Sequence, residues 1–179
     1  IRDVERSRGL GDVYKRQDEY KTGNILSEIK DERDEYSKQF RLDDGTTMAV
    51  SYKEPIHYKN AAGEWVDYDN SLKNETVNSA SPDEVTEEYT NKKSDFKVNY
   101  SKKSKENSMV KIKDDNQKIS WGYKDTNKVK STIVNNDEEL TDNDKFTTLK
   151  NLTSEITYEN IYDDVDVQYF TTTTGVKEN

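Results

Sequence analysis

Three aspartates near the end of the chain, Asp163, Asp164 and Asp166, are its best candidates for a metal site. Carboxylate oxygens are the ligands that calcium prefers in proteins. The acidic runs lack the fixed spacing of a helix–loop–helix calcium loop, which also needs a glycine and a distal glutamate. Aspartate is equally a typical turn residue. The sequence therefore leaves two interpretations of these residues, a calcium site and a solvated turn.

Four aromatic residues, Tyr58, Trp65, Trp121 and Tyr123, could together form a platform for sugar rings. Such a platform requires their rings to lie exposed on one face of the protein. Aromatic residues on alternating strands more often pack in a core or pair across strands, where each buries about 150–250 Å². Carbohydrate binding is thus an alternative function, and packing in the core is the other interpretation.

The residues that usually carry catalysis are scarce. The chain has one histidine, His57, and no cysteine, so it has no thiol nucleophile, thiolate zinc site or disulfide. Without a second histidine or a spaced Ser and Asp, His57 makes no triad, and we interpret it as a surface histidine on a strand. The chain has 37 acidic residues, so no pair of acids for glycoside hydrolysis can be singled out. We expect no enzyme activity and no cofactor.

Composition limits the class of protein. The 179 residues carry a formal net charge of −9, 36% are charged, and the mean hydropathy is −1.22. These values approach those of disordered chains, but twelve tyrosines and two tryptophans supply area for a thin core. An acidic chain lacks the basic surface that phosphate neutralisation needs, so we expect no nucleic-acid partner. No apolar run approaches the ~18 residues of a membrane helix, and we expect neither a membrane span nor an export signal here.

Residues 1–17 differ abruptly in composition from the rest of the chain, and they show neither helical nor strand periodicity. The string closely resembles a translated sequencing adapter, and a disordered natural tail is the alternative. Without it, 23 basic and 34 acidic residues remain, a formal charge of −11. We exclude these residues from the prediction of the fold.

The remaining residues are organised as short strands. Apolar residues at three- to four-residue spacing predict a short helix or an extended leader over 18–38. Alternating apolar and polar runs come next, separated by turn residues such as those at 43–45 and 60–63. These runs predict strands at 40–42, 48–52, 56–58, 65–68, 96–100, 109–113, 119–123, 129–134, 156–158 and 165–169.

Nine or ten short strands with turns between them predict an all-β fold, an antiparallel β-sandwich formed by residues 39–179 as one domain. Two polar stretches, near 73–94 and 135–147, have the composition of mobile loops. Gly175, after a run of threonines, resembles the turn of a hairpin whose return strand is missing. We therefore expect a truncated C-terminus with an unpaired edge.

Residues 25–72 resemble the amino-terminal region of large wall-associated RHS/YD-repeat proteins of Gram-positive bacteria. The resemblance is carried by Phe40-Arg41-Leu42, Asp44-Gly45-Thr46, the run EPIHYK at 54–59, Gly63-Glu64-Trp65 and residues 67–70. A second block at 96–101, 118–121 and 156–179 agrees with it.

The resemblance implies a β-rich region that precedes the repeats of a secreted, polymorphic-toxin-like surface protein and is not its catalytic part. On this basis we expect a non-catalytic module, extracellular or associated with the cell wall, with a structural or anchoring role. Its expected partners are the rest of the parent chain and cell-wall polysaccharide. A fragment of a larger secreted enzyme, with further residues beyond Asn179, is a second alternative.

Overall fold

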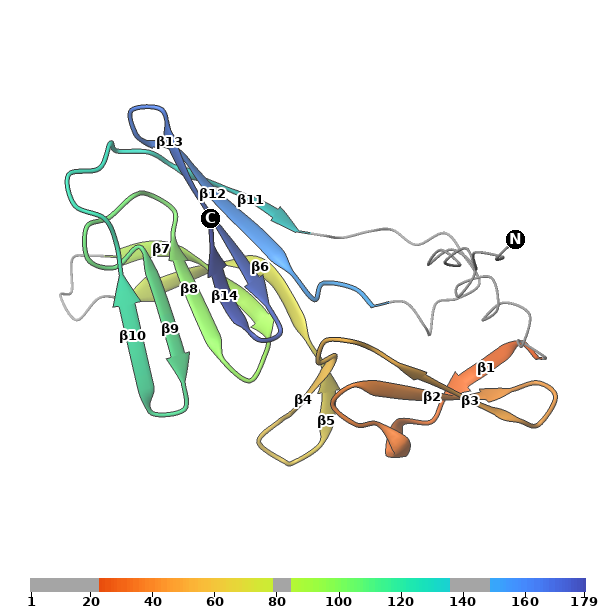
Figure 1. The fold of residues 1–179 in the computed structure, drawn as a ribbon. Coiled ribbons are helices and arrows are strands. Elements are labelled where there is room, and N and C mark those ends of the chain that lie inside the picture. Colours follow the sequence, from red (N-terminus) through yellow and green to blue (C-terminus); the bar gives the residue numbers. More distant parts are fainter. Residues whose placement is uncertain (1–22, 79–84, 136–148) are drawn as a thin grey trace, which may run out of the picture.

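The computed structural model describes residues 23–78, 85–135 and 149–179 (Figure 1). These residues form fourteen strands in four antiparallel sheets, together with one short 3-10 turn. The all-β prediction is confirmed, whereas the expected nine or ten strands are too few. Residues 1–17, interpreted as a sequencing scar, lie outside the described residues.

The first sheet contains three strands in the order β1-β2-β3. Of the short helix or extended leader expected over 18–38, the helix is not seen in the described part, because Ile25–Glu28 is an extended strand whose Ile25 pairs with Leu42. Phe40 and Leu42 on β2 are buried, and the turn after them contains Gly45 at φ 83°, a conformation that favours glycine. The elements are β1 (Ile25–Glu28), the 3-10 turn η1 (Lys30–Glu32), β2 (Ser37–Leu42) and β3 (Thr47–Ser51).

The next two strands, β4 (His57–Lys59) and β5 (Trp65–Asp67), form a hairpin of their own. The side-chain oxygen of Asn60 accepts hydrogen bonds from the backbone N–H groups of Ala62 and Glu64, which fixes the turn between the strands. Such Asx-type bonds are the reason that asparagine is favoured in turns.

A five-stranded sheet comes next, in the order β10-β9-β8-β7-β6. The loop expected at 73–94 is wrong, since all of its described residues except Ser94 belong to two long paired strands. Leu72 on the first of them is buried on the inner face, and Asn91 on the second is buried with its side chain fully bonded. The strands are β6 (Asp69–Asn78), β7 (Val85–Lys93), β8 (Lys97–Ser101), β9 (Val110–Asp114) and β10 (Gln117–Trp121).

The last sheet has four strands in the order β11-β12-β13-β14. The strand thought to be missing is present, because residues Gly175–Glu178 turn back and pair with β13. The strands are β11 (Ser131–Asn135), β12 (Ser154–Tyr162), β13 (Val165–Thr172) and β14 (Gly175–Glu178). The loop expected at 135–147 lies outside the described residues apart from Asn135, which ends β11.

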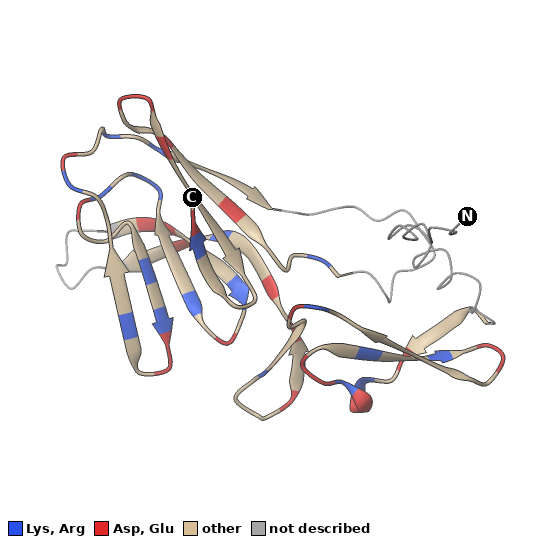
Figure 2. Ribbon diagram, viewed as in Figure 1, with Lys and Arg blue, Asp and Glu red and all other residues tan. Residues whose placement is uncertain are grey.

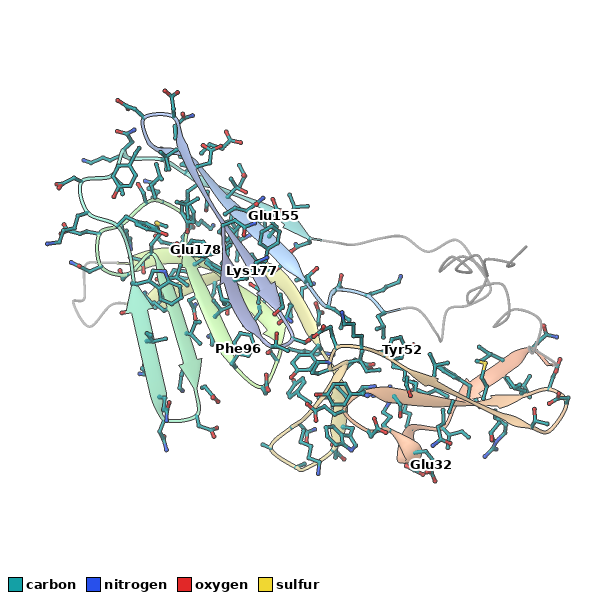
Figure 3. The ribbon with its side chains drawn as sticks, in the orientation of Figure 1. Glu32, Tyr52, Phe96, Glu155, Lys177 and Glu178 are labelled. Atoms are coloured by element: carbon teal, nitrogen blue, oxygen red, sulfur yellow. The ribbon has the colours of Figure 1, made fainter. Side chains whose placement is uncertain are left out.

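The five-stranded and four-stranded sheets lie one over the other and share a single hydrophobic core (Figures 1 and 3). We call them together the two-sheet body. Three fully buried tyrosines hold its layers together by rings and hydroxyls. The hydroxyl of Tyr158 donates to the carbonyl of Ser101 at 2.5 Å, and that of Tyr100 lies 2.9 Å from the hydroxyl of Thr171. The ring of Tyr169 lies edge-on to that of Tyr158 at 6.3 Å.

Candidate functional site

The four aromatic residues proposed as a sugar platform lie in two separate places. Tyr58 and Trp65 belong to the β4–β5 hairpin, where the Tyr58 ring packs on Tyr68 at 5.0 Å. The ammonium group of Lys59 lies 4.9 Å from the centre of the half-buried Trp65 ring. A cation at this distance already occupies one face of the indole.

The other two aromatic residues close one end of the two-sheet body. The indole N–H of Trp121 donates to the hydroxyl of Tyr169 at 3.3 Å, and that hydroxyl donates to Tyr123 at 3.1 Å. Burial, with a hydrogen bond to Glu178, raises the pKa of Tyr123 to about 12. These rings therefore connect the two sheets, and the structure does not bring them together with Trp65.

The three aspartates considered for calcium lie at the β12–β13 turn. The carboxylate of Asp166 accepts the backbone N–H of Asn160 at 2.7 Å, and Asp163 lies 3.5 Å from the side-chain nitrogen of Asn127. Asp164 has φ 59°, as turn residues often do. Within the described ranges, no group of three or more His, Asp or Glu side chains is placed to hold a metal ion.

His57 is fully buried, so its interpretation as a surface histidine is wrong. It belongs to an ionic cluster of Glu28, Arg33, Lys38, His57 and Asp67. Asp67 on β5 accepts Lys38 Nζ at 2.7 Å and Arg33 Nη2 at 3.1 Å, and Arg33 also makes two bonds to Glu28, at 2.6 and 2.8 Å. The cluster thus ties the β4–β5 hairpin to the three-stranded sheet.

The neighbours of His57 place a proton on one of its two ring nitrogens. Its Nδ1 lies 2.6 Å from the carbonyl oxygen of Asp34, which can only accept, so this nitrogen carries a proton. Its Nε2 lies 3.4 Å from a carboxylate oxygen of Asp67. Burial opposes ionisation of Asp67, but bonds from His57 and Lys38 and the charges of Lys38 and Arg33 hold its pKa well below the usual range.

A groove of about 540 Å³ opens at one end of the two-sheet body, between β7, the β8–β9 loop and the start of β11. We call it the lysine groove, after Lys102, Lys103, Lys105 and Lys130, which line it. Its acidic side chain is Glu87, which is exposed and pairs with Lys102 at 2.9 Å. Figure 2 shows lysines in the loop after β8 and in the segment before β11.

Backbone contacts bring the groove's lysines together. Lys103 and Lys130 face each other in an isolated antiparallel bridge, and Ser131 N–H donates to the carbonyl of Lys102 at 3.0 Å. The loop that carries Lys105 rests on Gly122, where a Cβ would lie only 2.3 Å from the Lys105 carbonyl oxygen. Directly opposed residues in such a bridge have Cβ atoms about 4.5–5.5 Å apart, so the bridge anchors two positively charged side chains next to each other.

The net charge of the whole chain does not reveal this groove, because the basic segment that forms most of it is outweighed by acidic residues elsewhere. Residues 92–130 contain twelve lysines and five acidic residues, a formal charge of +7, while the rest of the chain carries −16. A sum over a moving window would have found the basic segment. That Lys103 and Lys130 lie opposite each other could not have been found this way, because their pairing is tertiary.

No protein-family model, curated protein or solved structure matches the chain. In the part of the chain that the structure describes, no helix has the length and apolar character needed to cross a membrane.

Proposed function

We propose that the chain is a non-catalytic, extracellular β-sandwich module that serves as a structural or anchoring part of a large wall-associated RHS-repeat protein. The observation that supports this proposal is that aromatic side chains of the two-sheet body are engaged in hydrogen bonds inside the body itself. Tyr100, Tyr158 and Tyr169 all bond between or within its layers, and Trp121 donates to one of them. Rings and hydroxyls used in this way rigidify a scaffold.

The ionic cluster supports the same role. Its charges face one another across two sheets, with the side chains of Arg33, Lys38 and His57 at most 9% exposed. Buried charges satisfied by each other fix the position of one element against another. A module that holds neighbouring domains in place needs its own elements to be fixed against one another in this way.

Carbohydrate binding remains the alternative function, and the exposed part of Trp65 is its best-placed group. Sedimentation with protein-free walls of a Gram-positive bacterium tests both functions. We expect the purified chain to sediment with the walls and Trp65→Ala to be retained equally. Loss of retention in a folded Trp65→Ala variant would favour the carbohydrate function, and a wild-type chain left in the supernatant would overturn anchoring.

A further inference from the structure

The lysine groove holds more positive charge than its own residues balance. Four lysines line it, and its acidic residue, Glu87, has a side chain 68% exposed and already paired with Lys102. Among the described residues, Lys103, Lys105 and Lys130 have no ion-pair partner. The backbone bridge keeps the positions of Lys103 and Lys130 opposite each other, and both side chains are exposed and can turn toward a common ligand. An anion between their ammonium groups would offset the charge of both.

The residue types in the groove indicate which anion fits. All four cations are lysines, which present compact charges on flexible stems and lack the planar fork with which arginine selects a bidentate partner. Ser131, half-buried at the edge of the groove, donates its hydroxyl to the carbonyl of Ser101 at 3.4 Å, so it offers an incoming anion no further donor from its side chain. The Tyr89 ring lies beneath the Lys102 ammonium, 5.1 Å from it, which leaves that face of the ring covered rather than free to stack on a base.

We propose that the lysine groove binds the phosphate groups of a flexible, phosphodiester-linked polymer of the cell wall. This inference rests on the proposed function, because that function places the protein at a wall. A flexible polymer can insert one or two phosphates into the groove while the rest stays in solvent. A stiff polyanion such as duplex DNA must also approach the acidic remainder of the chain, which carries −16 outside residues 92–130.

The test uses soluble poly(glycerol phosphate) and two double variants of the full chain. Lys103→Gln with Lys130→Gln removes the opposed pair in the groove. Lys113→Gln with Lys118→Gln is the matched control, because those two lysines also lie directly opposite each other, across β9 and β10, outside the groove. Both variants lose the same charge from the same kind of cross-strand pair.

We expect the groove variant to bind the polymer at least tenfold more weakly and the control variant to change affinity by less than twofold. The wild-type affinity should fall with added salt, and the groove variant should show a shallower dependence because fewer phosphates are contacted. Without polymer, the groove variant should melt no lower than the wild type, since two neighbouring positive charges are gone. With polymer, its melting temperature should no longer rise.

Equal losses in the two variants would overturn the inference, because they would show attraction to net charge rather than to the groove. Binding of duplex DNA as tight as binding of the polymer, and equally sensitive to the groove variant, would overturn it as well. Walls treated with hydrofluoric acid, which cleaves phosphodiesters, separate this inference from the proposed function. Equal retention on treated and untreated walls would refute the groove and keep anchoring, whereas polymer binding without wall retention would refute anchoring and keep the groove.

Discussion

Asp67 is the residue on which the ionic cluster depends most. It is the shared acceptor for Lys38 and Arg33 and lies 3.4 Å from Nε2 of His57, and these three side chains are nearly excluded from water. Removing this counter-charge leaves Lys38 buried without compensation, while Arg33 keeps its two bonds to Glu28. Asp67 itself is 51% exposed, so solvent screens part of its effect.

We expect Asp67→Asn to lower the free energy of unfolding of the N-terminal sheets by about 1–3 kcal/mol, a value reduced for that screening. Denaturant unfolding followed by Trp65 fluorescence in a Trp121→Phe background measures it, because Trp65 then reports on the β4–β5 hairpin alone. Asp31→Asn, on the exposed η1 turn, is the control. A change no larger than that of the control would contradict the role given to the cluster.

The Asp67→Asn substitution should also change how the stability of the protein depends on pH. The pKa of Asp67 is lower in the folded protein than the ordinary value of about 3.9. Its contribution to stability is therefore complete above that value and is lost as pH falls toward the lower folded pKa. Unfolding measured between about pH 5 and 2 should show the wild type losing more stability than Asp67→Asn, and parallel curves would argue against this.

Little about the surroundings of single residues could be predicted from the sequence. His57 was a lone histidine beside Tyr58, and its surroundings come from residues 34 and 67, distant in the chain. Alternation predicts the inward-facing residues of a strand such as Lys97–Ser101, although Ile119, Val134 and Val165 are exposed, and it does not say which charged side chains meet. The division of Trp65 and Trp121 between two places has the same cause, since both lie in the same kind of strand pattern.

At the scale of elements, the contact between Gly122 and the β8–β9 loop positions the backbone of Lys105, one of the residues that line the lysine groove. Gly122 admits the carbonyl oxygens of Lys105 and Glu106 where a methyl group would lie 2.3 and 2.4 Å from them. These are backbone atoms, so the loop itself must move to make room.

We expect Gly122→Ala to lower the free energy of unfolding by about 1–3 kcal/mol, as overpacking commonly does. Poly(glycerol phosphate) should also bind the variant more weakly, because Lys105 is displaced. Thermal unfolding and a binding titration measure the two effects, with Ser120→Ala on the exposed side of β10 as the control. A variant with unchanged stability and affinity would show that the loop accommodates the methyl group.

The errors about elements share one physical reason. The β6–β7 hairpin was predicted as a loop because its strands are polar on both faces. On the inner face, however, the Asn91 side chain accepts from Val98 N–H at 3.0 Å and donates to the carbonyl of Phe96 at 3.0 Å. Hydrogen bonds of this kind make buried polar residues tolerable in a strand, and composition alone does not reveal them. The more regular strands, such as Lys97–Ser101 and Val165–Thr172, were predicted correctly.

For the whole molecule, the buried tyrosines set the limit of stability at high pH. Burial raises the pKa of Tyr100, Tyr158 and Tyr169 above the ordinary value of about 10. Because the folded pKa lies above the unfolded one, their contribution is complete below about pH 10 and is lost as pH rises further.

We therefore expect an alkaline titration to proceed in two phases. Exposed tyrosines should ionise first without structural change, and the second rise in tyrosinate absorbance should coincide with loss of the near-ultraviolet circular dichroism signal. Refolding on return to neutral pH controls for chemical damage. Complete ionisation with the circular dichroism signal intact would contradict the buried network.

The segregation of charge along the chain also has a consequence before any contact is made. Residues 92–130 contain twelve lysines and five acidic residues, whereas residues 23–67 contain ten acidic and six basic residues. The molecule is therefore an electric dipole with a net negative charge. Near an anionic wall it is repelled as a whole but turned by a torque, so that its lysine end points toward the surface. Salt screens interactions between charges more than about 10 Å apart at 0.1 M, so both the repulsion and the torque weaken as salt is added, and arrival in one orientation should be favoured at low ionic strength.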